Sequence, residues 1–206
     1  MVACILISMI SKYSDLTIKQ FLNCKLISEM QSDPIDKNVR LLAEVSGKSV
    51  DEIESLPITE LKAKLKHLAN IEDLGEVGKV RMKFKVKGKS FKVIWKTQDL
   101  TSGQYIDVSH FTKEPEQIIY NIHNILAAIC VPMKYGLIQQ KYDGTKHKDI
   151  ADLLYNHMTI AQAYPIMLFF CKYYEELDKA ILTYLVEEGK KTLKVVEERF
   201  TQSTVG

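Results

Sequence analysis

The sequence has little of what marks a disulfide-stapled, collagen-like or disordered chain. Its four cysteines are spread over 206 residues without a CxxC pair, and this pattern favours buried free thiols over disulfides or zinc ligands. Nine glycines and five prolines are too few for a collagen-like or low-complexity chain. With 46% hydrophobic and 26% charged residues, the composition predicts a globular protein with a core large enough to fold without staples.

Long apolar runs and an excess of one charge are also missing. The 28 Lys and Arg nearly balance the 26 Asp and Glu, so the net charge of +2 indicates no particular partner. The apolar run that begins at Pro165 is too short to span a bilayer. The apolar N-terminus has no basic residue ahead of it, as a secretory signal requires. We therefore expect no membrane association.

Sequence motifs for catalysis, nucleotide binding and metal binding are not found. No segment matches a phosphate-binding loop, a dinucleotide fingerprint or a nucleophile elbow. Among five histidines, none forms a pair at metal-ligand spacing on one helix face; His147 and Asp149 come nearest, and a solvated loop explains them. His123 lies in an apolar stretch, which is typical of a core or interface histidine. We expect no enzyme activity, no cofactor and no metal.

The hydrophobic period predicts an α+β protein that is mainly helical, with a small antiparallel β-hairpin or three-stranded sheet in the middle of the chain. Four regions follow from the pattern. They are an N-terminal helical region (1–77), the hairpin or sheet (78–110), a C-terminal helical core (111–188) and a polar tail (189–206).

Capping residues place the helices of the first region. Asp33 followed by Pro34 is a typical helix start, and Gly47 is a typical stop. Ser49 and Glu52 have the spacing of a capping box, which predicts another short helix.

Strands are expected where the period changes to two. Basic and apolar residues alternate over 79–87, a turn is expected at Gly88-Lys89, and the extended pattern resumes over 90–96. A third strand is expected over 104–108. Beyond it, an apolar helix should run from Pro115 to 129.

The sharpest local feature is a basic row, with eight positive residues and no acid from 79 to 96. Six of them alternate with other residues and are expected to project from one face: Lys79, Arg81, Lys83, Lys85, Lys87 and Lys89. Three interpretations remain open. The row could bind phosphates, meet an acidic protein partner, or protect a strand from edge-to-edge aggregation.

A second candidate surface is aromatic and lies in a helix expected over 159–188. A helix that is apolar nearly all round is either the centre of a core or an oligomer interface. Tyrosine suits an interface because it buries area and keeps a polar tip. The candidate interface residues are Tyr164, Phe169, Phe170, Tyr173 and Tyr174.

Five segments resemble tail-gene-cluster structural proteins of Bacteroidetes phages, including the crAss-like podoviruses. They are 16–21 (LTIKQF), 35–43 (IDKNVRLLA), 46–53 (SGKSVDEI), 100–107 (LTSGQYID) and 125–132 (ILAAICVP). The resemblance implies a virion protein assembled in the host cytoplasm, as a ring or adaptor subunit of the head–tail connector or tail region. Its partners would be copies of itself, other portal or tail proteins, and DNA passing non-specifically.

Two alternatives stay open. One is a tail assembly chaperone, absent from the finished particle. The other belongs to a different class, a nucleic-acid-binding module that uses the basic hairpin.

Overall fold

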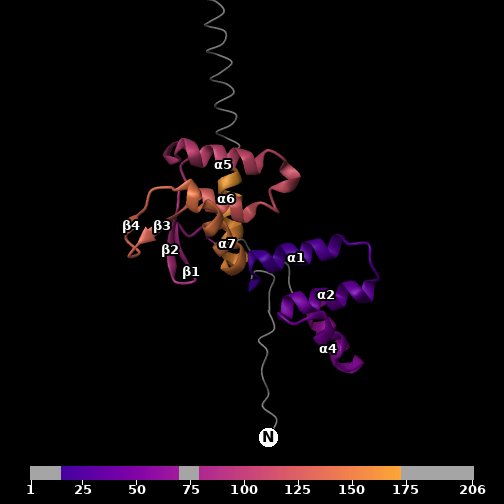
Figure 1. The fold of residues 1–206 in the computed structure, drawn as a ribbon. Coiled ribbons are helices and arrows are strands. Elements are labelled where there is room, and N and C mark those ends of the chain that lie inside the picture. Colours follow the sequence, from indigo (N-terminus) through magenta and orange to yellow (C-terminus); the bar gives the residue numbers. More distant parts are fainter. Residues whose placement is uncertain (1–14, 70–78, 173–206) are drawn as a thin grey trace, which may run out of the picture.

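The computed structural model describes residues 15–69 and 79–172, and Figure 1 follows the chain through them. Its α-helices are α1 (Ile18–Glu29), α2 (Pro34–Ser46), α3 (Val50–Glu54), α4 (Ile58–Ala69), α5 (Ser102–Thr112), α6 (Ile122–Ile129) and α7 (His147–His157). A further helical segment covers 160–172. The strands are β1 (Lys83–Val86), β2 (Lys89–Val93), β3 (Cys130–Lys134) and β4 (Ile138–Gln139).

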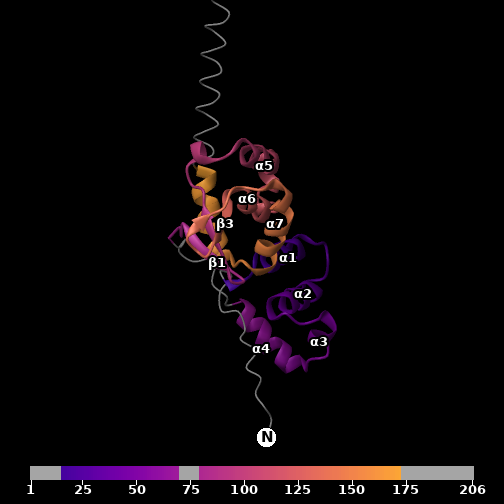
Figure 2. The same cartoon turned by 60° about the vertical axis from the view of Figure 1, so that its left-hand side comes forward.

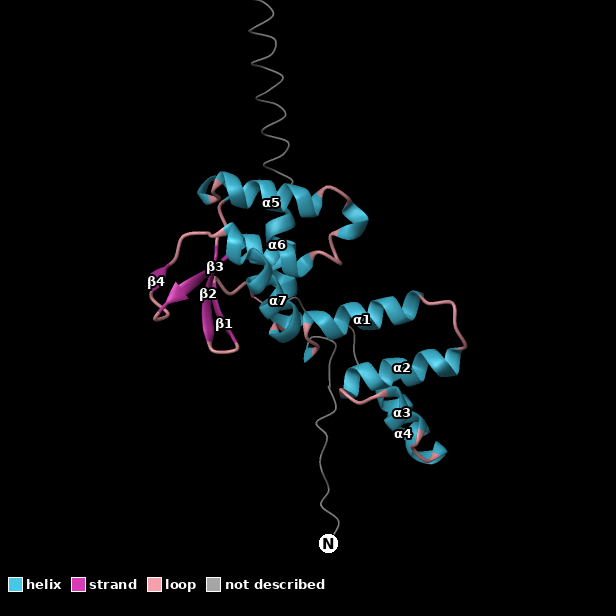
Figure 3. Cartoon of the chain, in the orientation of Figure 1, coloured by secondary structure: helices cyan, strands magenta, loops and turns pink. Residues whose placement is uncertain are grey.

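The four strands form one antiparallel sheet in the order β1-β2-β3-β4. Figure 3 shows this sheet at one side of a mostly helical chain. The predicted α+β class, mainly helical with a small antiparallel sheet, is therefore confirmed. The polar tail expected over 189–206 lies outside the described residues.

The predicted capping residues of the N-terminal helices are confirmed. The Asp33 carboxylate accepts a hydrogen bond from the Ile35 amide at 2.8 Å, and Gly47 ends α2 with a φ of 66°. Ser49 and Glu52 make both reciprocal bonds of a capping box at the start of α3. Each of these signals acts over a few residues, which is why the sequence alone reveals them.

The N-terminal region does not pack as one unit. Ile18 and Leu22 of α1 are buried in the largest core, which they share with the sheet, α5 to α7 and the 160–172 helix. The Ile18 amide also donates to the Met158 carbonyl at 2.9 Å. Helices α2, α3 and α4 bury a separate small cluster, and we call this part of the chain the α2–α4 lobe. The cluster contains Val39, Leu42, Ala43, Ile53 and Leu61.

The strand expected over 104–108 is wrong, because this segment lies inside helix α5. Thr101 and Gln104 form a capping box, and Gln104 also donates from Nε2 to the Ala128 carbonyl at 2.7 Å. The Thr-x-x-Gln spacing is itself a helix-start signal. The alternation of Ile106 and Val108 pointed to a strand, but packing buries only Val108 and leaves Ile106 64% exposed.

The sheet takes its third and fourth strands from farther along the chain. The helix expected from Pro115 to 129 is instead a 3₁₀ turn (Pro115–Gln117) followed by the shorter α6. Strand β3 begins at the next residue, Cys130, and pairs with β2 in the register Phe91↔Pro132. A proline within a central strand is unusual, so local sequence argued against it.

The thiols follow the prediction where they are described. Cys24 and Cys130 are free and buried, and burial raises the pKa of Cys24 to about 11. Cys171 is free and half-buried, and Cys4 lies outside the described residues.

Candidate functional site

A hollow of about 600 Å³ lies beside the turns of the two hairpins, β1–β2 and β3–β4. The turns are neighbours because β2 pairs with β3, with Ser90 opposite Met133. Helix α7 and the loop ahead of it supply the remaining wall. The lining residues are Lys85, Gly88, Lys89, Ser90, Phe91, Pro132, Met133, Tyr135, Gly136, Gln140, Lys146, Asp149, Ile150 and Leu153.

The lining combines an apolar surface with basic side chains. Tyr135 and Leu153 contribute apolar atoms, and Lys85, Lys89, Lys146 and Asp149 contribute charged groups. Lys146 is paired with Asp143 at 3.1 Å. Lys85 and Lys89 have no ion pair within the part of the chain that the structure describes. The hollow therefore suits a group that is apolar and negatively charged at its edges.

The β3–β4 turn beside the hollow exposes three large apolar side chains. Tyr135 is 81% exposed, Leu137 80% and Ile138 61%. The turn needs a left-handed backbone at Tyr135 (φ 53°) and at Gly136 (φ 69°), and this conformation holds the tyrosine out from the sheet. Burying three such side chains in a contact would be favourable, whereas leaving them in water is not.

The basic row expected on one face is divided by the structure. Lys83 and Lys85 are exposed on the outer face of the sheet, alternating with the buried Phe84 and Val86. Lys89 pairs with Val86 and so points toward the opposite face. The turn is Lys87-Gly88, one residue earlier than expected, with φ values of 47° and 78°.

Lys79 and Arg81 lie before β1 and belong to a different place. They line a second hollow of about 350 Å³ together with Phe84 and, from the 160–172 helix, Gln162 and Ile166. On the outer face the third lysine is Lys92, which lies opposite Lys83 and donates to the Gln139 side chain at 2.8 Å.

The predicted aromatic interface is also divided. Phe170 is only 2% exposed and lies in the largest core, so its area is already used within the chain. Tyr164 and Phe169 are half-buried. Tyr173 and Tyr174 lie outside the described residues.

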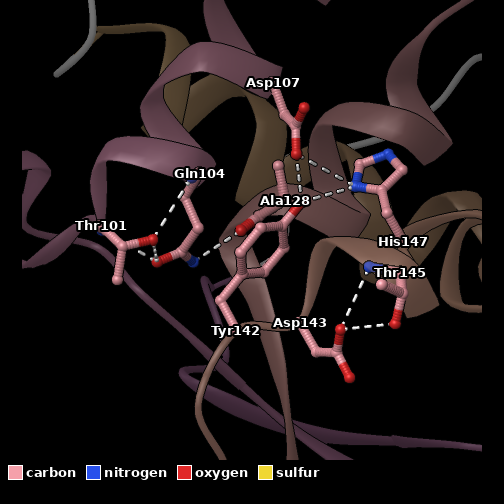
Figure 4. A network of polar contacts seen from close by, with 8 residues as sticks. All are labelled: Thr101, Gln104, Asp107, Ala128, Tyr142, Asp143, Thr145 and His147. Carbon is pink, nitrogen blue, oxygen red and sulfur yellow. Dashed lines mark hydrogen bonds and ion pairs between the residues drawn. The ribbon is translucent and has the colours of Figure 1, made fainter.

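A polar network holds one wall of the hollow in place, and Figure 4 shows its members. The Tyr142 hydroxyl donates to the Asp107 carboxylate of α5 and lies 2.9 Å from Nδ1 of His147, the first residue of α7. Phe111 stacks on the His147 ring with centroids 5.6 Å apart. The loop at 140–146 is thus tied to α5 and α7, and it carries Gln140 and Lys146 into the hollow.

The protons of this network follow from its geometry. Burial, followed by the bond to Asp107, raises the pKa of Tyr142, so the phenol keeps its proton and donates it to Asp107. Its oxygen can then only accept, which places the His147 proton on Nδ1. Burial lowers the pKa of His147, and Asp107 opposes that shift in part. Nε2 of His147 is buried without a hydrogen-bond partner among the described residues.

Sequence reasoning missed this network because Asp107 and Tyr142 are far apart in the chain. A local signal existed only for the adjoining turn, where Asp143 accepts from the Thr145 amide at 3.1 Å. None of the hollows described above is lined by Asp107, Tyr142 or His147. The network therefore positions the loop, whereas the hollow and the exposed turn are open to a partner.

Comparison with known proteins adds no relative: no family model, no curated protein and no solved structure matches the chain. Over residues 15–69 and 79–172, no cluster of three or more His, Cys, Asp or Glu is placed to hold a metal ion. In the same ranges, no helix has the length and apolar character needed to cross a bilayer.

Proposed function

We propose that the chain is a structural subunit of a phage virion, part of an oligomeric ring or adaptor in the head–tail connector or tail region. Its resemblance to phage tail-cluster proteins supplies the setting. The observation that carries the assembly role is the exposed β3–β4 turn, where Tyr135, Leu137 and Ile138 present apolar area beside the hollow.

An interface explains this turn better than a free surface does. Contiguous apolar patches rimmed by polar residues mark contact sites on soluble proteins. Tyrosine is enriched at the centre of such contacts, and lysine is typical of their rim. Here Tyr135 lies between Lys134 and Gly136, and the Lys134 ammonium is 5.3 Å from its ring centroid.

The test is the oligomeric state of the full chain, measured by mass photometry and electron microscopy. We expect rings or ring fragments from the wild type and monomers from the triple variant Tyr135→Ser, Leu137→Ser, Ile138→Thr. Ile106→Ser is the matched control, because Ile106 is 64% exposed on α5, away from the turn. A wild-type chain that stays monomeric at every concentration would contradict the proposal.

The tail assembly chaperone is separated from the virion subunit by a second measurement. Mass spectrometry of purified particles should detect this chain in stoichiometric amount if it is a subunit. Its absence from particles, together with its presence on a tail protein in infected cells, would favour the chaperone.

A nucleic-acid-binding module is the second candidate, and the outer face of the sheet favours it. Lys83, Lys85 and Lys92 lie on that face, which suits phosphate contact without base recognition. Binding of random duplex DNA that weakens steeply with salt, and that Lys83→Glu with Lys92→Glu removes, would support this function. The exposed apolar turn has no part in it.

A further inference from the structure

Two segments on opposite sides of the molecule carry opposite charge. From 49 to 61, which covers α3 and the start of α4, the sequence has four Asp and Glu and no Lys or Arg, although the α2–α4 lobe as a whole is balanced, with six of each over 34–69. From 79 to 96 it has eight Lys and Arg and no acid. Figures 1 and 2 show the lobe and the sheet on opposite sides of the central helices. The charges are therefore separated in space as well as in sequence.

The α2–α4 lobe exposes an apolar side chain in its acidic segment. Ile58, the first residue of α4, is 62% exposed. Asp51 and Glu54 of the preceding helix α3 are also exposed. Arg40 bonds Asp36 at 3.0 Å, and Lys64 pairs with Glu60 at 3.5 Å, so both of these bases already have carboxylate partners. We call Asp51, Glu54 and Ile58 the acidic knob.

The acidic knob has the chemistry that the hollow requires. The hollow offers an apolar surface at Tyr135 and Leu153 for an aliphatic side chain such as Ile58. Its rim offers Lys85 and Lys89 for the carboxylates of the knob. We infer that the hollow of one copy takes the acidic knob of a second copy. This contact identifies the part of a neighbouring copy that binds the hollow, and the inference rests on the ring assembly proposed above.

The contact is head-to-tail because its two halves are different surfaces of the same chain. Each copy then offers one hollow and one knob, and such heterologous contacts form a ring when the rotation between copies closes. A symmetric contact between two hairpin ends would instead bring two basic surfaces together, which costs free energy. The exposed turn at Tyr135 would be covered by the same neighbour, since Tyr135 lines the hollow.

A charge-swap experiment on the full chain tests the contact. The hairpin variant is Lys85→Glu with Lys89→Glu, and the knob variant is Asp51→Lys with Glu54→Lys. In either variant alone, the hollow and the knob carry the same charge and repel each other. We therefore expect self-association to weaken roughly 10- to 100-fold by mass photometry. Mixed in equal amounts, the two should assemble again in alternation. Lys19→Glu with Lys113→Glu is the control, because it changes the same residue types elsewhere and should assemble like the wild type.

The outcomes separate this contact from the proposed function. If the wild type assembles and both variants do so equally well, or if the mixture does not restore assembly, the knob–hollow contact is overturned and the ring stands. If the wild type itself stays monomeric, both are overturned. Circular dichroism verifies folding of each variant. The neutral pairs Lys85→Gln with Lys89→Gln, and Asp51→Asn with Glu54→Gln, replace any variant that unfolds, and each is then expected to weaken assembly by a smaller factor.

Discussion

The large core and the α2–α4 lobe are stabilised in different ways. The core joins residues from Ile18 to Phe170 and includes six of the eight residues of α6, of which Ile125, Leu126 and Ile129 have no exposed area. The lobe buries five residues within a stretch of 23, from Val39 to Leu61. Contacts between distant segments therefore stabilise the core, whereas helix caps and short turns contribute much of the stability of the lobe.

This difference predicts unequal stability within one chain. A region with few buried apolar contacts opens locally at lower free energy than a region whose core is shared by many elements. The lobe is linked to the rest through α1 and the residues just before it, because Leu16 and Cys24 pack with Val45 of α2. We therefore expect the lobe to open while the core stays closed. The following predictions test this contrast.

The largest effect is expected in the core. Leu126→Ala removes a fully buried side chain and should lower the free energy of unfolding by roughly 2–5 kcal/mol, because a cavity replaces it. Denaturant unfolding followed by tryptophan fluorescence measures the loss.

In Ile53→Ala, amide exchange should accelerate in α2 to α4 and remain slow in α6. Equal acceleration in α6 would show that the lobe and the core unfold together.

The next effect concerns a side chain that joins two parts of the core. Ala128 lies in the last turn of α6, and the chain becomes extended at Cys130, so no later residue of the helix can donate to the Ala128 carbonyl. Nε2 of Gln104 donates to it instead. Gln104→Leu should cost about 1–3 kcal/mol because that buried carbonyl loses its donor. Thr101→Ala removes the cap alone and should cost about 1 kcal/mol. Equal losses in thermal unfolding would contradict this role for Gln104.

A smaller effect is expected where the lobe depends on backbone conformation. Gly47 ends α2 at a φ of 66°, and an added Cβ would meet no atom within 4 Å, so Gly47→Ala tests conformation alone. We expect a loss of about 1–2 kcal/mol, seen as faster amide exchange in the lobe. Gly103→Ala is the control, since Gly103 is helical and its Cβ would make an ordinary contact with Tyr142 at 3.8 Å. It should be neutral or slightly stabilising.

The smallest effect depends on pH. The pKa of His147 is lowered in the folded chain from its ordinary value of 6.5, so the unfolded chain binds the proton more tightly. The free energy of unfolding should therefore fall as the pH drops below 6.5. His147→Asn keeps an N–H near Tyr142 and removes the titration, so its decline with pH should be shallower. His123, whose pKa burial also lowers, leaves part of the decline in place.

Tyr142→Phe supplies the companion measurement. It removes the bonds to Asp107 and His147 and should cost about 1 kcal/mol near neutral pH. If the free energy of unfolding fell as steeply at low pH in His147→Asn as in the wild type, His147 would not be the cause of that fall, and the prediction would be wrong.

The parts of the fold that the sequence predicted correctly are those with local causes. Asp33, Gly47 and the Ser49–Glu52 box act within a turn of their own position, so their residue types were sufficient. The hairpin of β1 and β2 was similarly evident from alternation. The segment at 104–108 was misjudged because its alternation resembled a strand, although Thr101 and Gln104 carried a helix-start signal.

The geometry of the candidate site followed from the sequence only in part. The basic row was predicted on the hairpin that lines the hollow, but the strand register decided which lysines share a face. Lys83 and Lys85 lie on one side, and Lys89 lies on the other. No local pattern could place β3 beside β2 or bring Tyr142 to Asp107, because these contacts join distant parts of the chain.

The sequence by itself determined the α+β fold class, the helix ends in the α2–α4 lobe and the separation of charges along the chain. These depend on composition, period and capping, which act between near neighbours. Only the tertiary structure decided that β3 extends the hairpin into a sheet, that a hollow forms beside its two turns, and that Tyr135, Leu137 and Ile138 remain exposed there. The physical reason is that pairing and burial between distant segments outweigh local preference wherever a large core is shared.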